Sequence, residues 1–348
     1  MVLNFFVKGP PKQFGRCSAL GEANLKPRLL AMLVAAAIAM AAVSRGQAET
    51  YPIHPVRMII AFSAGGSVDA LGRILAQKLS EYWGQQVTVE NRTGALGNIG
   101  ALAAARAAPD GYTLHFTTQA LAVNVTLAPM AELDPLKDFE PVMLVASAQD
   151  ILIVPPDSQF KTVKDLIDFA KANPGRLTYG TLGTSSSGNM AVAVFAEMNG
   201  RLEMRQVAYS QTSQLTTDVL SGRVDVFFPT TGAHIGNVVS GRVRALGVSG
   251  PKRAEQLPDI PTLQESGVNY PDATSWYAMF APKGTSKDIV AKINRDLAHI
   301  LTLPEVKELQ SKLGFVTLGG TPEKLGEYFK SEIGKWGEIA RDPLFVGK

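Results

Sequence analysis

Small and hydroxyl-bearing residues occupy the stretch from Ser63 to Asp69, where a buried strand is predicted to end and a helix to begin. Gly65 and Gly66 permit backbone angles that other residues avoid, and they let a ligand approach the main chain closely. A glycine loop that enters a helix presents free N–H groups and a partial positive charge at one point, which suits an anion. The alternative is a plain strand-to-helix turn, in which Ser67 or Asp69 only caps the helix.

A second junction of the same kind lies further along the chain. The predicted strand Leu177–Thr181 leads through the glycine- and serine-rich run Gly183–Gly188 into a predicted helix, Asn189–Met198. In open α/β sheets, ligands bind outside the carboxyl ends of the strands. Two anion-binding loops on two lobes that face each other would therefore form a cleft.

Enzyme chemistry has weak support in the sequence. The glycines of Gly94–Gly100 do not have the spacing of a dinucleotide-binding loop, and no phosphate loop with its lysine occurs. The run Gly183–Gly188 fails as a serine nucleophile elbow because position 187 is Ser187 instead of glycine. A secreted hydrolase that uses one of three serines stays open as an alternative; these are Ser185, Ser186 and Ser187. The histidines are scattered without metal-ligand spacing, so we expect neither metal nor cofactor; they are His54, His115, His234 and His299.

The first 48 residues have the pattern of a secretory signal peptide. Lys26 and Arg28 precede the apolar run Leu29–Val43, and small residues lead to a predicted cleavage after Ala48. That run is 15 residues long, shorter than the roughly 20 needed to span a bilayer, although an uncleaved anchor is the alternative. The only cysteine, Cys17, lies in this leader without a lipobox before it, so the mature chain would have no disulfide.

Removal of the leader changes the charge of the chain. Of 34 basic residues six lie in the leader, which leaves 28; of 31 acidic residues one does, which leaves 30 and a net charge of −2. No basic patch interleaved with aromatic residues occurs, so a nucleic-acid partner is not expected.

Strands and helices alternate along the mature chain in two runs, which predicts an α/β fold with two domains. The expected strands and extended segments are Arg57–Phe62, Gln86–Glu90, Tyr112–Thr117, Pro141–Ser147, Ile151–Val154, Leu177–Thr181, Met204–Ala208, Val224–Phe228, Arg244–Val248 and Trp276–Ala281. The expected helices after the first loop are Gly97–Ala107, Val163–Asn173, Asn189–Met198, Gln211–Leu220, His234–Val239, Ser286–Leu301, Pro304–Lys312 and Pro322–Ile339.

An ordered set of short motifs resembles the Bug family, the receptors of the tripartite tricarboxylate transporters. The motifs are Tyr51–Pro52, Pro55–Arg57, Phe62–Asp69, Val89–Arg92, Gly97–Gly100, Ala108–Leu114, Asp134–Phe139, Gly222–Asp225, Arg244–Leu246, Leu257–Thr262 and Thr274–Trp276. They cover essentially the whole mature chain. Each motif is weak alone, and the ordered set is specific.

The resemblance implies a periplasmic binding protein of the type II-like, Venus-flytrap kind, with a mostly parallel sheet flanked by helices in each lobe. Lobe 1 would comprise residues 49–152 and 274–348, and lobe 2 residues 153–273, with hinges near Ile151–Val154 and Asp272–Trp276. The ligand would be a small carboxylate, and the partners would be the integral membrane subunits of the transporter. The receptor would be monomeric. The implied ligand-binding residues are Ser63, Ala64, Gly65, Gly66, Ser67, Asp69, Thr118, Gln119, Thr184, Ser185, Ser186, Ser187, Asn189 and Tyr209.

Several positions depart from the family pattern. Ser210 and Gln211 stand where members usually have lysine and glycine, Pro229 where an aspartate is usual, and Ser63 and Thr93 where a proline is usual. The departures at Ser210, Gln211 and Pro229 lie where lobe 2 would meet a ligand, so they bear on specificity more than on fold. An extracytoplasmic sensor that reports ligand to a membrane kinase is the alternative to a transport receptor.

Overall fold

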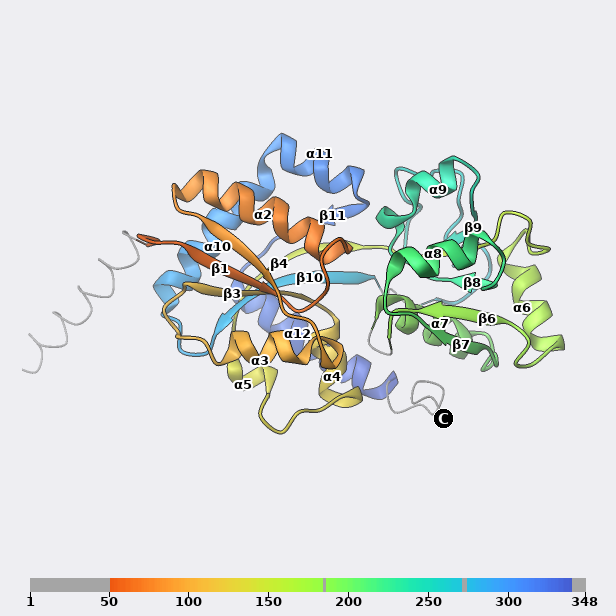
Figure 1. Cartoon of the computed structure of the whole chain (residues 1–348), viewed down its shortest axis with the longest axis horizontal. Helices are drawn as coiled ribbons and strands as arrows, with labels where there is room; N and C mark the ends of the chain where they lie inside the picture. Colours follow the sequence, from red (N-terminus) through yellow and green to blue (C-terminus); the bar gives the residue numbers. More distant parts are fainter. Residues whose placement is uncertain (1–50, 184–185, 271–273, 340–348) are drawn as a thin grey trace, which may run out of the picture. The chain divides into compact units, whose positions relative to one another are not determined.

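Two β-sheets, each covered by helices, organise the part of the chain that the structure describes (Figure 1). The computed structural model describes residues 51–183, 186–270 and 274–339, which belong to one compact unit of the chain. We call the part with the six-stranded sheet lobe 1 and the part with the five-stranded sheet lobe 2. This arrangement confirms the predicted two-lobed α/β fold, although the sheets are mixed instead of mostly parallel because some of their strands pair antiparallel with their neighbours.

The sheet of lobe 1 has the strand order β11-β4-β10-β3-β1-β2. The central strand β1 (Val56–Ile60) pairs in parallel with β2 (Val87–Asn91) and β3 (Thr113–Thr118). Strand β10 (Ser275–Pro282) lies antiparallel between β3 and β4 (Phe139–Ala148), and β11 (Phe315–Thr317) pairs antiparallel with β4. The sheet is therefore mixed, with β1, β2, β3 and β4 sharing one direction.

Alternation along β1 decides which helices cover which face of this sheet. Met58 and Ile60 belong to the same core cluster as Leu71 of α2 (Ser67–Trp83) and residues of α10 (Lys287–Thr302). Ile59 points the other way and packs with residues of α3 (Asn98–Ala105), α4 (Ala120–Leu127) and α12 (Pro322–Ile339). Figure 1 shows these two helical layers on opposite faces of the sheet. The period of two in a strand buried on both faces explains why Met58, Ile59 and Ile60 are all apolar. The remaining helices of lobe 1 are η1 (Ala95–Gly97), α5 (Pro135–Asp138) and α11 (Pro304–Lys312).

The sheet of lobe 2 has the strand order β7-β6-β8-β5-β9. Strand β6 (Thr178–Thr181) pairs in parallel with β7 (Arg205–Ala208) and β8 (Val226–Phe227). Strand β5 (Ile151–Val154) runs antiparallel to β8 and to β9 (Arg244–Val248). The helices of this lobe are α6 (Val163–Ala172), α7 (Ser187–Met198), α8 (Thr212–Leu220), η2 (Thr231–Ala233) and α9 (Ile235–Val239).

The expected elements are present, with ends that shift by one or two residues. Five further elements were not expected from the sequence: α4, α5, β11 and the short 3₁₀ helices η1 and η2. Helix α4 has the sequence ALAVNVTL and no polar face, so no helical period marks it. Helix α5 and strand β11 have only four and three residues, too few for a periodic pattern.

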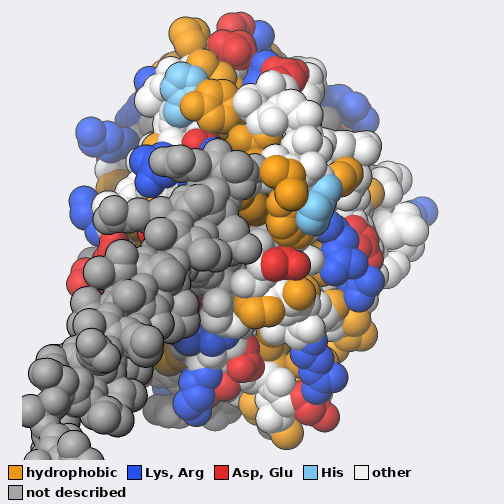
Figure 2. Space-filling model, turned by 90° about the vertical axis from the view of Figure 1, so that its left-hand side faces the viewer, with side chains coloured by type: hydrophobic (Ala, Val, Ile, Leu, Met, Phe, Trp, Pro, Cys, Tyr) orange, Lys and Arg blue, Asp and Glu red, His pale blue; other side chains and the backbone are white. Residues whose placement is uncertain are grey.

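Basic and acidic side chains are interspersed with apolar ones on the face of the molecule shown in Figure 2. This mixture agrees with the small net charge that the chain has without its leader. Within the described ranges, no helix combines the length and the apolar character that a membrane span requires.

The chain crosses between the lobes at Gln149 and Asp150, which link β4 to β5, and again between β9 and β10. Away from these crossings, η2 of lobe 2 touches the loop before β11 of lobe 1, backbone against backbone. A β-carbon on Gly232 would lie 1.6 Å from the carbonyl oxygen of Leu313, and one on Gly314 would lie 2.8 Å from the nitrogen of Gly232. Only glycine permits this approach at position 232.

We therefore expect Gly232→Ala to lower the free energy of unfolding by about 1–3 kcal/mol, because the methyl group must push two backbone segments apart. Urea unfolding monitored by circular dichroism would measure the loss. Gly236→Ala is the matched control, since a β-carbon there meets no atom within 4 Å. Equal stability of the two variants would contradict the prediction.

Candidate ligand-binding site

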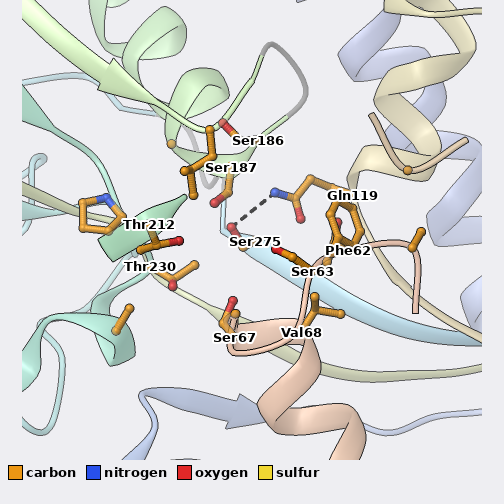
Figure 3. Close-up of a pocket in the computed structure, with 18 of the residues that line it drawn as sticks. Phe62, Ser63, Ser67, Val68, Gln119, Ser186, Ser187, Thr212, Thr230 and Ser275 are labelled. Atoms are coloured by element: carbon orange, nitrogen blue, oxygen red, sulfur yellow. Dashed lines mark hydrogen bonds between the residues drawn. The ribbon is translucent and has the colours of Figure 1, made fainter. Parts of the chain in front are cut away.

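A cavity of about 470 Å³ lies between the two lobes (Figure 3). Its lining consists of Ala61, Phe62, Ser63, Gly65, Gly66, Ser67, Val68, Thr93, Gly94, Leu96, Gly97, Thr118, Gln119, Leu182, Ser186, Ser187, Gly188, Ser210, Thr212, Phe227, Phe228, Pro229, Thr230, Ala233, Ser275 and Tyr277. None of these described lining residues carries a charge, whereas hydroxyl groups are frequent. A small polar or anionic molecule would have to be held by hydroxyls, one amide and backbone N–H groups.

The N-terminus of α2 points at this cavity and has no side-chain cap. Its N-cap residue Gly66 has an extended backbone, with φ −81° and ψ 170°, and no side chain accepts a hydrogen bond from the first turn. The first N–H groups of a helix have no acceptor within the helix, and they carry a partial positive charge. Gly65 and Ser67 line the cavity at this point. The first turn of α2 is thus available to an anion.

Asp69 holds this loop in place from behind. Its carboxylate accepts hydrogen bonds from Gly65 N, Arg73 Nε and Asn91 Nδ2, each at 2.9 Å. Burial alone would raise the pKa of Asp69, but hydrogen bonds from Arg73, Gly65 and Asn91 outweigh burial and hold that pKa below its ordinary value. Asp69 is not among the residues that line the cavity, so it acts on the loop and not on the cavity surface.

The opposite wall is built by the N-terminus of α7. Ser186 caps this helix by accepting a hydrogen bond from Asn189 N at 3.3 Å, and its hydroxyl donates to Gly183 O at 2.7 Å. The α7 backbone packs closely on the end of β8, because a β-carbon on Gly188 would lie 2.5 Å from Phe228 O. Ser186 and Ser187 thereby face the cavity from lobe 2 (Figure 3).

The floor of the cavity is a chain of hydrogen bonds that begins at β10. Tyr277 Oη and Ser67 Oγ are 3.0 Å apart, which ties β10 to the α2 loop. Gln119 Nε2 donates to Ser275 Oγ at 3.3 Å, and Ser275 Oγ donates to Asp150 Oδ2 at 3.3 Å (Figure 3 shows the first of these bonds). The polar floor is thus connected to the segment where the chain crosses between the lobes.

The predicted site residues divide into three groups. Eight of them line the cavity: Ser63, Gly65, Gly66, Ser67, Thr118, Gln119, Ser186 and Ser187. Four others are described but do not line it: Ala64, Asp69, Asn189 and Tyr209. Asn189 Oδ1 accepts from Tyr179 Oη and Gln206 Nε2, and Tyr209 Oη donates to Asp218 at 2.8 Å. Thr184 and Ser185 lie outside the described residues.

The sequence reasoning identified Ser67 and Gln119 of the polar floor, but it missed Ser275 and most of the apolar lining. Ser210 and Pro229, which depart from the family pattern, do line the cavity, whereas Gln211 does not. Ser275 could have been found from its place beside Trp276 at the expected lobe junction. At the same junction, Tyr277 is predicted either to pack in the core or to form the wall of a pocket, and it does line the cavity. Phe62 begins the Phe62–Asp69 motif, whereas Leu96 and Leu182 carry no motif that marks them as cavity residues.

The histidines of the described chain are placed as structural residues. Burial lowers the pKa of His115 and of His234 to about 4. His115 Nδ1 lies 3.2 Å from Ile59 O, and His234 Nε2 lies 3.3 Å from Thr216 Oγ1. Within the described residues no cluster of His, Cys, Asp and Glu could hold a metal ion.

A cavity between two α/β lobes, with hydroxyl-bearing side chains in its lining, is typical of two-lobed solute-binding proteins. Residues 71–343 match the family model described as tripartite tricarboxylate transporter family receptor. The chain therefore belongs to this family of receptors, as its motifs indicated.

Relatives and solved structures agree with this assignment. The chain is 35% identical over 318 residues to a UPF0065 protein in the tcbD-tcbE intergenic region of Pseudomonas sp. (strain P51), covering 91% of this chain and 94% of the relative. The structure of the periplasmic binding protein BugD is similar, with TM-score 0.77 and 31% identity over 84% of this chain and 98% of that one. So is R. palustris Rpa4515 with adipate, with TM-score 0.78 and 31% identity over 84% and 97% of the two chains. The resemblance to the Bug family is confirmed.

Asp150, at the crossing below the cavity floor, gives a pH-dependent prediction. Burial raises the pKa of this fully buried carboxyl from 3.8 to about 7, although hydrogen bonds from Ser275 and Ser187 lower it. From about pH 4 to pH 7 the unfolded chain loses this proton while the folded protein keeps it. The contribution of Asp150 to stability is therefore complete below about pH 4, and it falls by at most about 4 kcal/mol as the pH rises to 7.

We expect Asp150→Asn, which has no proton to lose, to gain stability relative to the unsubstituted protein as the pH rises from 4.5 to 8. Urea unfolding of both proteins at several pH values in that range would measure the difference. A difference that stays constant with pH would show that the carboxyl is ionised throughout.

Proposed function

We propose that this chain is a periplasmic receptor that captures a small organic carboxylate between its lobes and delivers it to a tripartite tricarboxylate-type membrane transporter. The observation that carries the proposal is the uncapped N-terminus of α2, which faces a cavity whose described lining residues carry no charge. A carboxylate there would accept hydrogen bonds from backbone N–H groups and from neighbouring hydroxyls such as Ser63 and Ser67. Membership of the receptor family and the adipate in the similar Rpa4515 structure support this ligand class.

The compartment, the partners and the movement belong to the same proposal. Residues 1–48 would direct export and be removed, and the mature receptor would be a monomer without cofactor. Lobe closure about the crossings at residues 149–150 and between β9 and β10 would enclose the ligand, a hinge movement common among such receptors. The transporter's integral membrane subunits would then recognise the closed form.

A thermal-shift screen of the mature protein against organic acids tests the proposal. We expect at least one acid to raise the melting temperature at millimolar concentration, because a ligand that binds only the folded state stabilises it by mass action. A screen of aliphatic, aromatic and amino acids in which no compound raises the melting temperature would contradict carboxylate binding.

The backbone contact itself can be tested at Ser67, the first residue of α2. Ser67→Pro removes one N–H group, and proline suits this position because the first helical turn tolerates it and Gly66 before it is already extended. Ser67→Ala is the matched control, since both variants lose the hydroxyl but only the proline variant loses the N–H group.

We expect Ser67→Pro to weaken carboxylate binding about tenfold or more beyond Ser67→Ala, the usual range for a hydrogen bond to a charged group. Isothermal titration calorimetry with the acid found in the screen would measure both dissociation constants. Equal constants would place the carboxylate away from the α2 N-terminus.

A further inference from the structure

Apolar side chains from both lobes contribute to the cavity lining, among them Phe62, Leu96 and Leu182. Phe62 and Leu96 come from lobe 1 and lie beside Gly97, where a β-carbon would be 3.4 Å from Phe62 Cζ. Leu182 comes from lobe 2 and is 40% exposed. Leu96 reaches the loop that follows Leu182, because a β-carbon on Gly183 would lie 3.4 Å from Leu96 Cδ2. We call these three side chains the apolar clasp.

Leu96 holds its place in the clasp in an unfavourable backbone conformation. Its φ is 59° and its ψ is 26°, and Ala95 before it also has a positive φ of 44°. A leucine rarely adopts this left-handed region, which glycine enters freely. Strain of this kind persists where surrounding structure enforces it, and it is concentrated at functional sites.

Two buried asparagines enforce the conformation of this loop. Asn124 Nδ2 donates to Leu96 O and to Asn98 Oδ1, each at 2.9 Å. Asn98 Nδ2 in turn donates to Ala128 O at 2.7 Å. The loop is thus fixed to α3 and α4, and the strained leucine presents its side chain to the cavity instead of collapsing into the core.

We propose that the apolar clasp binds the hydrocarbon body of the acid, so that this receptor selects carboxylates with an unsubstituted aliphatic or aromatic body over hydroxylated acids and citrate-like tricarboxylates. The inference rests on the proposed function, since it names the ligand class of the same cavity. Hydroxyl groups placed against Phe62, Leu96 and Leu182 lose hydrogen bonds to water without replacement. A third carboxylate would also find no cation among the described lining residues.

Matched acids test this selectivity directly. Adipate and galactarate are six-carbon dicarboxylates that differ only in four hydroxyl groups, and hexanoate and citrate extend the comparison in charge. By calorimetry we expect adipate or hexanoate to bind the mature protein at least tenfold more tightly than galactarate and citrate. Tighter binding of galactarate or citrate would overturn the clasp but leave carboxylate binding intact. Binding of no acid at all would overturn the proposed function and the clasp with it.

Substitutions in the strained loop separate the side chain from the backbone. Leu96→Asn keeps the left-handed conformation, which asparagine tolerates, but replaces the apolar side chain with a polar one. We expect it to weaken adipate or hexanoate binding about tenfold and to narrow their advantage over galactarate, with an unchanged fold by circular dichroism. Ala95→Gly is the matched control, because it relaxes the same loop and Ala95 does not line the cavity. An unchanged selectivity ratio in Leu96→Asn, or an equal loss in Ala95→Gly, would overturn the role of the side chain.

Discussion

The position of one loop, Ser63–Ser67, governs what the cavity can bind, and the carboxylate of Asp69 fixes that loop. Asp69 accepts a hydrogen bond from Gly65 N, while the helix that follows has no side-chain cap at Gly66. Arg73 and Asn91 complete the shell of donors around Asp69 and compensate its negative charge. These charged groups therefore lie behind the loop, and the described residues at the cavity surface are neutral.

The lack of charge among the described lining residues suits a receptor that must release its ligand. A buried arginine would bind a carboxylate strongly. However, removing its charge from water costs free energy, and this cost remains when the cavity holds no ligand. Helix N-termini and hydroxyls act over a short range and depend on orientation. Anion binding by such groups is sensitive to lobe position, because Ser63 and Ser67 lie on lobe 1 whereas Ser186 and Ser187 lie on lobe 2.

The sequence predicted the fold better than it predicted the cavity. The run Arg57–Phe62 and the loop after it could be identified because strand period, glycines and a helix start agree at one place. The sequence predicts that Asp69 binds the ligand or caps the helix, whereas in the structure it holds the loop and does not line the cavity. Its three hydrogen-bond partners come from two sequence regions, and only folding brings them together. Gln119, Ser275 and Asp150 meet through strand pairing of β3, β10 and β4, a long-range register that no local pattern encodes.

The role of Leu96 could not be predicted from the sequence. In the run Gly94–Gly100 the glycine spacing excludes a nucleotide-binding loop, and no sequence pattern indicates a role for the leucine. Its meaning depends on a positive φ that Asn124 and Asn98 enforce from other helices. Leu96 has a backbone conformation that is unfavourable for leucine but is held by tertiary contacts. Natural proteins keep such conflicts between local and tertiary structure mainly where function needs them. The polar floor and the strained Leu96 side chain thus suit different parts of one ligand. The floor can donate hydrogen bonds to a carboxylate, and the leucine favours the hydrocarbon part of the same molecule.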